Sequence, residues 1–316
     1  MIDDLDSDSD NDDENSESEY ENSEDENRLI NASKVGNFEL VQNLIEKNIN
    51  IDCEDYEGLT SLMYACIDNN FECAEYLINK GANIHLEDRC QTTALLFACG
   101  NDSFECVKLL IEKDADVNHV DRSEMTPLTR ASCNNYLECV KLLIDNGADV
   151  NYENNSGNTA LIRTSERGHV ECLKILLDNG ANVNHKKNFG DTALIMASKE
   201  GHLNCLKILL EKGANIDDAD NQGYTALIHA IKKSHLECVK LLIENGANID
   251  HKDSSGMTPL MWACKNTHLE CVQILLHNGA DIHQISSNNK TAYDIATLKE
   301  IKNLIMDHNE TKFILK

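Results

Sequence analysis

Apolar residues along this chain recur in one arrangement with a fixed period of 33 residues. The copy that begins at Thr192 shows the arrangement clearly. Apolar side chains at 193, 194 and 197 share one face of a short helix, and Gly201 interrupts that helix. From Leu203 to Leu210, leucines at spacings of three and four predict a second helix, which Gly213 ends. The polar stretch that follows is rich in turn-forming residues and predicts a hairpin loop before the next copy.

The threonine that starts this copy marks the register of the whole repeat. One unit of 33 residues cannot bury its own apolar faces, whereas a stack of such units can. We therefore predict an all-α solenoid of helix-turn-helix units joined by β-hairpin loops, about nine units over residues 27–316. The two end units depart from the pattern, as capping units should, and in the last one the second apolar helix is expected three or four residues early. A weak first copy starts at Asn27, and the threonine recurs at Thr60, Thr93, Thr126, Thr159, Thr192, Thr225, Thr258 and Thr291.

Residues 1–26 have a different composition, with fourteen Asp or Glu and neither Lys nor Arg. Dense like charge and almost no apolar residue predict a disordered acidic leader. Two interpretations of the leader stay open. It is either a solubilising segment or a regulated tail in which five serines, each with an acidic residue three positions later, resemble substrates of acid-directed kinases. These serines are Ser7, Ser9, Ser16, Ser18 and Ser23.

The charge and the N-terminal sequence exclude several classes of partner. A formal net charge of -27 argues against nucleic acid, because binding to nucleic acid rests on basic contacts to phosphates. The N-terminus has no secretory signal pattern, and no apolar run reaches the roughly 18 residues that cross a membrane. We expect an intracellular protein of the cytoplasm or nucleus, monomeric and without a membrane partner.

The thirteen cysteines do not have the spacing of a disulfide framework. Equivalent positions in stacked helices lie roughly 8–10 Å apart, beyond the Cα separation of about 7 Å that a disulfide allows. We predict buried, reduced core residues. Seven of the cysteines occupy one repeat position, at Cys73, Cys106, Cys139, Cys172, Cys205, Cys238 and Cys271.

Histidine precedes that cysteine by three residues in four copies, and His-x-x-Cys is a spacing found in zinc sites. A zinc site needs about four converging ligands, whereas these pairs are a whole repeat apart. Packing is the favoured interpretation, so we predict no metal and no cofactor. No glycine-rich phosphate loop, nucleophilic serine elbow or HExxH motif is present, and we predict no enzymatic activity. The four pairs are His169 and Cys172, His202 and Cys205, His235 and Cys238, and His268 and Cys271.

The repeated phrases resemble the ankyrin repeat family. They are Thr-Pro-Leu at 126 and 258, Thr-Ala-Leu at 93, 159, 192 and 225, Gly-His at 168 and 201, and Gly-Ala followed by Asn or Asp at six positions. The resemblance covers about nine tenths of the chain. One departure is the loss of the family's usual histidine after Thr-Pro-Leu. Near-identical units rich in Asn, Ile and Lys also resemble the ankyrin proteins of giant DNA viruses.

The resemblance implies a protein partner bound on the concave face, made of first helices and hairpin tips. Large or cationic side chains, the types found at binding hot spots, occupy the expected outward position four residues after the capping threonine. Close to them lies a basic strip of Arg167, Lys199, Lys232, Lys233 and Lys265, and hairpin residues extend the surface: Tyr56, Arg89, Arg122, Phe189 and Tyr224. The predicted partner-binding residues are Tyr64, Phe97, Arg130, Arg163, Met196, Tyr224, His229 and Trp262.

Three other interpretations stay open. The varied side chains are ordinary surface residues that stacking leaves unconstrained, or the protein is a passive decoy without a dedicated partner. In the third, the chain is a substrate of asparaginyl hydroxylation, because Asn118, Asn151 and Asn184 stand at the hairpin position that this modification targets in ankyrin proteins.

Overall fold

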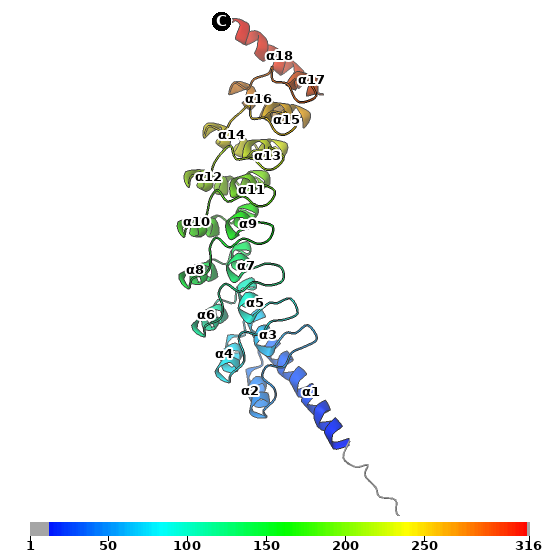
Figure 1. Ribbon diagram of the computed structural model, residues 1–316, viewed down its shortest axis with the longest axis vertical. Helices are drawn as coiled ribbons and strands as arrows, with labels where there is room; N and C mark the ends of the chain where they lie inside the picture. The colour runs from blue at the N-terminus through cyan, green and yellow to red at the C-terminus, as the bar shows by residue number, and fades with distance from the viewer. Residues whose placement is uncertain (1–12, 315–316) are drawn as a thin grey trace, which may run out of the picture. The chain divides into compact units, whose positions relative to one another are not determined.

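The computed structural model describes residues 13–314, with side chains described for residues 24–309, and every regular element in this part of the chain is a helix (Figure 1). The structure divides into two compact units, Met1–Ala148 and Asp149–Lys316. The division falls between two repeats. The all-α repeat architecture predicted from the periodicity is confirmed.

The first unit contains four helical pairs. Successive first helices of the pairs (α1, α3, α5, α7) pack against one another, and so do successive second helices (α2, α4, α6, α8). The helices are α1 (Asp13–Lys34), α2 (Phe38–Glu46), α3 (Ser61–Ile67), α4 (Phe71–Asn79), α5 (Ala94–Gly100), α6 (Phe104–Glu112), α7 (Pro127–Cys133) and α8 (Leu137–Asp145).

The second unit contains five pairs, stacked in the same way. Its first helices and the hairpins before them carry the candidate site described below. The helices are α9 (Ala160–Arg167), α10 (Val170–Asp178), α11 (Ala193–Glu200), α12 (Leu203–Glu211), α13 (Ala226–Lys232), α14 (Leu236–Glu244), α15 (Pro259–Lys265), α16 (Leu269–His277), α17 (Ala292–Ile295) and α18 (Lys299–Ile314).

The recurrent threonine caps each first helix from α3 onward. In α11, Thr192 has an extended backbone and its hydroxyl accepts the backbone N–H of Ile195 at 3.2 Å, which satisfies one of the free donors of the first turn. The hairpin before each first helix closes by turn hydrogen bonds, and in three repeats it also forms a single antiparallel bridge, as between Ala219 and Thr225. Capping and hairpin together orient the first helix in every repeat.

The recurrent cysteine lies in the core between the two layers of helices. Cys205, Leu206 and Leu209 of α12 are fully buried, and the other cysteines at this repeat position are 0–2% exposed. All thirteen cysteines are free thiols, and Cys90 is the exposed one. The prediction of buried, reduced core residues is confirmed for the recurrent position.

The end units differ from the others. Helix α1 reaches back to Asp13, well before the expected start at Asn27. Residues 13–26 of the predicted leader are thus helical in the structure. Residues 1–12 lie outside the described part, and the disorder predicted for them stays a prediction. At the other end, α18 begins at Lys299, three residues earlier than the register of the other second helices, as predicted.

Candidate functional site

Two repeat positions that lie nine residues apart make direct contact. One is the hairpin position five residues before the capping threonine, and the other is the first-helix position four residues after it. We call a hydrogen-bonded set of these two side chains a hairpin–helix pair. In four such pairs the hairpin residue is an aspartate, and its Oδ2 accepts the hydrogen bond. In a fifth, Nζ of Lys187 donates to Sδ of Met196 at 3.6 Å. The four aspartate pairs are Asp55 with Tyr64 at 2.7 Å, Asp121 with Arg130, Asp220 with His229 at 2.8 Å, and Asp253 with Trp262 at 2.8 Å.

The second carboxylate oxygen of the same aspartate closes the hairpin. Oδ1 of Asp220 accepts the backbone N–H groups of Gln222 and Tyr224, both at 2.9 Å. One side chain thus fixes the hairpin and ties it to the helix. Sequence reasoning missed this role, although the signal was present, because aspartate recurs five residues before the threonine at Asp55, Asp88, Asp121, Asp220 and Asp253.

The predicted outward orientation of the first-helix position is wrong for three of the residues placed there. Met196, His229 and Trp262 are 2%, 9% and 8% exposed. Hydrogen bonds to hairpin aspartates draw His229 and Trp262 inward. The other predicted residues are half-buried: Tyr64, Phe97 and Arg130 in the first unit, and Arg163 and Tyr224 in the second.

Five side chains of the second unit form one cluster. The ring of Tyr224 stands perpendicular to the rings of His229 and Trp262, with centroids 5.5 Å away in each case. Nζ of Lys232 lies 3.6 Å from the centroid of Tyr224 and 4.5 Å from that of Trp262. Nζ of Lys265 also lies 4.5 Å from the Trp262 ring. We call Tyr224, His229, Lys232, Trp262 and Lys265 the aromatic–lysine cluster.

Burial changes the titration of three members of the cluster. Burial raises the pKa of Tyr224, as do the charges of Asp253 and Asp220. Burial lowers the pKa of His229 below 6.5, with Lys232 acting in the same direction and Asp220 opposing. The imidazole is therefore neutral at pH 7. Burial also lowers the pKa of Lys232, with Asp220 and Asp253 opposing and the positive charges of Lys265 and Lys199 adding to the effect of burial.

Lysine occupies one first-helix position in three consecutive repeats. Lys199, Lys232 and Lys265 each stand seven residues after the capping threonine, at the ends of α11, α13 and α15. None of the three forms an ion pair within 4.0 Å among the described residues. By contrast, Lys174 and Lys240 on second helices each pair at 2.7 Å with a glutamate three residues before them.

The hairpin tips expose large apolar side chains. Phe189, before α11, is 72% exposed, and Tyr56 of the first unit is 76% exposed. Arg163 on α9 forms an ion pair with Glu166 at 3.1 Å. The second unit therefore presents aromatic, cationic and apolar side chains on its first helices and hairpins, which we call the first-helix face.

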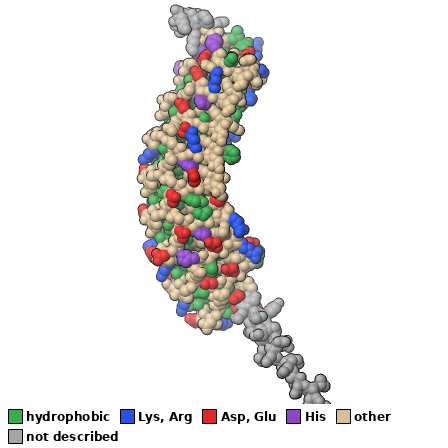
Figure 2. Space-filling model, viewed as in Figure 1, with side chains coloured by type: hydrophobic (Ala, Val, Ile, Leu, Met, Phe, Trp, Pro, Cys, Tyr) green, Lys and Arg blue, Asp and Glu red, His purple; other side chains and the backbone are tan. Residues whose placement is uncertain are grey.

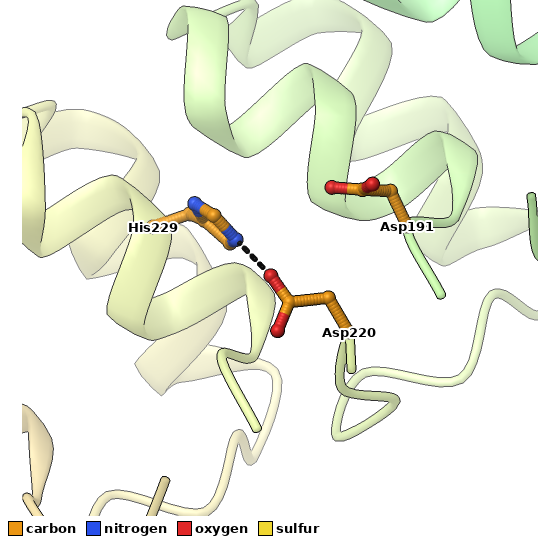
Figure 3. A group of neighbouring side chains, drawn as sticks. All are labelled: Asp191, Asp220 and His229. Carbon is orange, nitrogen blue, oxygen red and sulfur yellow. Dashed lines mark hydrogen bonds and ion pairs between the residues drawn. The ribbon is translucent and has the colours of Figure 1, made fainter. Parts of the chain in front are cut away.

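In the described part, one group of three side chains that could bind a metal ion lies close together. It consists of Asp191, Asp220 and His229. Nε2 of His229 and one oxygen of each carboxylate all lie within 4.8 Å, and the Asp191 carboxylate points toward the hydrogen-bonded pair (Figure 3). A neutral imidazole and two carboxylates are ligands that zinc accepts. However, Asp220 already accepts three hydrogen bonds, and Asp191 pairs with Lys187 at 3.3 Å. Protein contacts therefore account for the arrangement.

The histidines of the His-x-x-Cys pairs lie at the turn between helices, as predicted. Nε2 of His202 is 3.0 Å from the carbonyl oxygen of Glu166, and Nε2 of His235 is 3.1 Å from that of Lys199. Each contact joins a second helix to the preceding repeat. These interactions support the packing interpretation of the two histidines.

The three asparagines considered for hydroxylation also join repeats. Their side-chain amides donate to glycine carbonyl oxygens of the following repeat, and the Oδ1 of Asn151 accepts the backbone N–H of Asn182 at 2.8 Å. This geometry gives asparagine a packing role at the position. The donor distances are 3.1 Å for Asn118, 3.0 Å for Asn151 and 3.3 Å for Asn184.

Comparison with protein families agrees with this architecture. A model of three consecutive ankyrin repeats matches residues 7–88, 81–154, 148–220 and 217–286. The chain belongs to the ankyrin repeat family. Ankyrin repeats are generally modules for protein–protein interaction. Comparison of this ankyrin chain with curated proteins gave no match. Among the described residues, no helix has the length and apolar character needed to cross a membrane.

Proposed function

We propose that this ankyrin protein is a non-enzymatic adaptor of the cell interior that binds a protein partner through the first-helix face of its second unit. The observation that carries the proposal is the aromatic–lysine cluster. Residues that recur in every repeat are explained by the stacking of the repeats. Tyr224, His229 and Trp262, by contrast, stand at positions whose residues differ from repeat to repeat. That three such residues pack together supports a specific role for them.

The composition and rigidity of the cluster favour binding. Tryptophan, tyrosine and arginine dominate the energetics of protein interfaces, and fixed side chains lose little conformational entropy when a partner docks. The hydrogen bond from Trp262 to Asp253 and the ring contacts of Tyr224 hold the cluster in place. Phe189 and Arg163, in preceding repeats of the same unit, supply further accessible side chains.

The predicted residues of the first unit form a secondary part of the proposal. Tyr64 and Arg130 are each tied to a hairpin aspartate, and Phe97 is half-buried at the equivalent position. Lys34 lies 5.0 Å from the centroid of the Tyr64 ring. We propose that these side chains make peripheral contacts with the same class of partner.

Affinity capture from cell extract, compared between the full chain and point variants, tests the proposal. Trp262→Ala, Arg163→Ala and Phe189→Ser should each lose a partner that the unaltered protein retains. The last two remove contact area on the first-helix face, and Trp262→Ala removes the ring that holds Tyr224, Lys232 and Lys265 in place. Lys240→Ala, on a second helix, is the matched control and should retain it. Circular dichroism establishes that Trp262→Ala remains folded. Capture that is the same for all variants would favour a passive decoy and would contradict the proposal.

A further inference from the structure

We propose that the aromatic–lysine cluster, together with Lys199, is a docking site for an acidic peptide segment of the partner. The inference rests on the proposed function and adds the chemical class of the bound segment, which is a run of Glu or Asp side chains.

Repulsion between like charges is the first observation. Lys199, Lys232 and Lys265 stand at the same position of three stacked helices. Packed helices lie about 8–10 Å apart, and charges at that distance still interact at physiological ionic strength, where the screening length is about 8 Å. Three cations in a row without ion pairs therefore repel one another. A run of carboxylates would relieve this repulsion.

The acidic residues nearest to the cluster, Asp220 and Asp253, attract Lys232 but form no direct ion pair with it, because their oxygens are engaged elsewhere. Asp253 accepts the backbone N–H groups of Ser255 and Met257 on one oxygen and the Trp262 indole N–H on the other. Asp220 accepts the equivalent hydrogen bonds from two backbone N–H groups of its hairpin and from His229. Neither aspartate forms an ion pair with Lys232 within 4.0 Å. The two carboxylates therefore fix the hairpins and reduce the repulsion at Lys232, without pairing directly with any of the three lysines.

A row of three lysines at this position occurs in the second unit alone. In the first unit the same repeat position is held by Lys34, Ile67, Gly100 and Cys133, so Lys34 has no lysine at that position in the next repeat. Acidic and basic side chains are intermixed over the face that Figure 2 shows. In a chain of formal net charge -27, three consecutive unpaired lysines depart from that mixture. Complementarity of charge favours an acidic partner and speeds its association.

The rings beneath the lysines prepare the site for a carboxylate. Lys232 lies over both Tyr224 and Trp262, and Lys265 lies over Trp262, at distances typical of cation–π contacts. Contacts of this kind restrict the flexible lysine stems and strip water from the ammonium groups. A carboxylate that arrives there meets cations that have already lost part of their conformational freedom and hydration. Burial lowers the pKa of Lys232, in agreement with partial desolvation of its ammonium group.

The span of the site sets the length of the probe. Three helices at a spacing of about 10 Å cover about 20 Å, which an extended peptide crosses with six or seven residues at about 3.3 Å each. An octaglutamate peptide carrying fluorescein is therefore long enough to reach all three lysines. Trp262 is the only tryptophan of the chain, so its emission reports directly on the site.

The experiment titrates the full chain into labelled octaglutamate, follows fluorescence anisotropy, and records Trp262 emission with unlabelled peptide. We expect saturable binding and a change in Trp262 emission, both weakened by salt. Lys232→Met with Lys265→Met should weaken binding at least about tenfold, because it removes two of the three charges that would contact the peptide. Lys207→Met with Lys240→Met, which removes the same charge from second helices, should change it less than about twofold.

Several results would overturn the inference. They are the absence of saturable binding at millimolar peptide, equal weakening in both double variants, or equal binding of octaglutamine. Equally tight binding of an octauridylate RNA would show a surface for any polyanion. The proposed function is tested separately, by the affinity capture described above. If Trp262→Ala loses the captured partner while octaglutamate does not bind, the adaptor role stands and the acidic class is wrong.

Discussion

At the scale of single residues, His229 shows how burial governs titration. Its pKa is lowered by burial, with Lys232 adding and Asp220 and Asp191 opposing. Above pH 6.5 the imidazole is neutral in the folded and the unfolded chain. As the pH falls below 6.5, the unfolded chain binds a proton that the folded chain resists, so folding stability declines until the pH has passed the folded pKa.

We predict that the unaltered protein loses more stability than His229→Gln between pH 7.5 and 5.5. Glutamine keeps a donor for Asp220 and does not titrate, so it removes this proton linkage alone. Urea unfolding at both pH values measures the difference. Equal losses in the two proteins would show that the His229 ring is protonated in the fold as readily as in the unfolded chain.

Asp114 is a second residue whose local conformation has a cost. It stands where six other repeats have the helix-stopping glycine, and its backbone keeps the left-handed conformation with φ +65°. A residue with a Cβ is strained there. We predict that Asp114→Gly raises the free energy of unfolding by about 1 kcal/mol, measured by urea denaturation.

The reciprocal replacement is the control for Asp114. Gly81 has φ +97°, and a Cβ added to it would meet no atom within 4 Å, so the cost of Gly81→Asp is conformational alone. It should lower stability by about 1 kcal/mol. No gain from Asp114→Gly would mean that the aspartate compensates its strain in another way.

At the scale of elements, the hairpin aspartate has two roles, since one carboxylate oxygen closes the hairpin and the other binds the first helix. The repeat of the second unit that has Asn154 at this position shows the first role by itself. Oδ1 of Asn154 accepts the N–H groups of Ser156 and Asn158 at 3.0 and 2.9 Å, as aspartates do in other repeats. Asparagine at this position therefore closes the hairpin without a charge.

We predict that Asp220→Asn costs less than about 1 kcal/mol of stability and Asp220→Ala about 2–3 kcal/mol, because alanine leaves two hairpin N–H groups without an acceptor. Thermal unfolding of both variants, with exposed Glu211→Ala as a reference for charge loss, measures the contrast. Equal costs for Asn and Ala would show that the carboxylate charge matters rather than the hairpin bonds.

The elements themselves were predictable from the sequence because their signals are local. The threonine cap, the leucine spacing and the stop glycine each lie within one repeat, and the periodicity placed the helices in register. The site was less predictable. Exposure at one repeat position ranges from half-buried Tyr64 to Met196 at 2%, because it depends on the hairpin of the same repeat and on side chains from the previous one. Lys232 and Tyr224 reach Trp262 from the preceding repeat, and no local pattern encodes that contact.

At the scale of the whole molecule, the cysteines report on the integrity of both stacks. Twelve of the thirteen are buried, and burial raises the pKa of Cys139 and Cys264 to about 12 each. Thiolate is the reactive form, so buried thiols of high pKa react slowly. We predict that a thiol reagent labels one cysteine rapidly in the native protein, and that Cys90→Ser abolishes this phase. Several fast thiols would indicate that the repeats open readily.

The central claim is that partner recognition lies on the first-helix face of the second unit. Two sets of three lysines test it within one chain, with Lys199, Lys232 and Lys265 on first helices and Lys174, Lys207 and Lys240 on second helices. Acetylation footprinting of the captured complex, read by mass spectrometry, compares the two sets directly. We predict that the partner protects the first-helix lysines and leaves the second-helix lysines as reactive as in the free protein. Protection of the second-helix set alone would contradict the account.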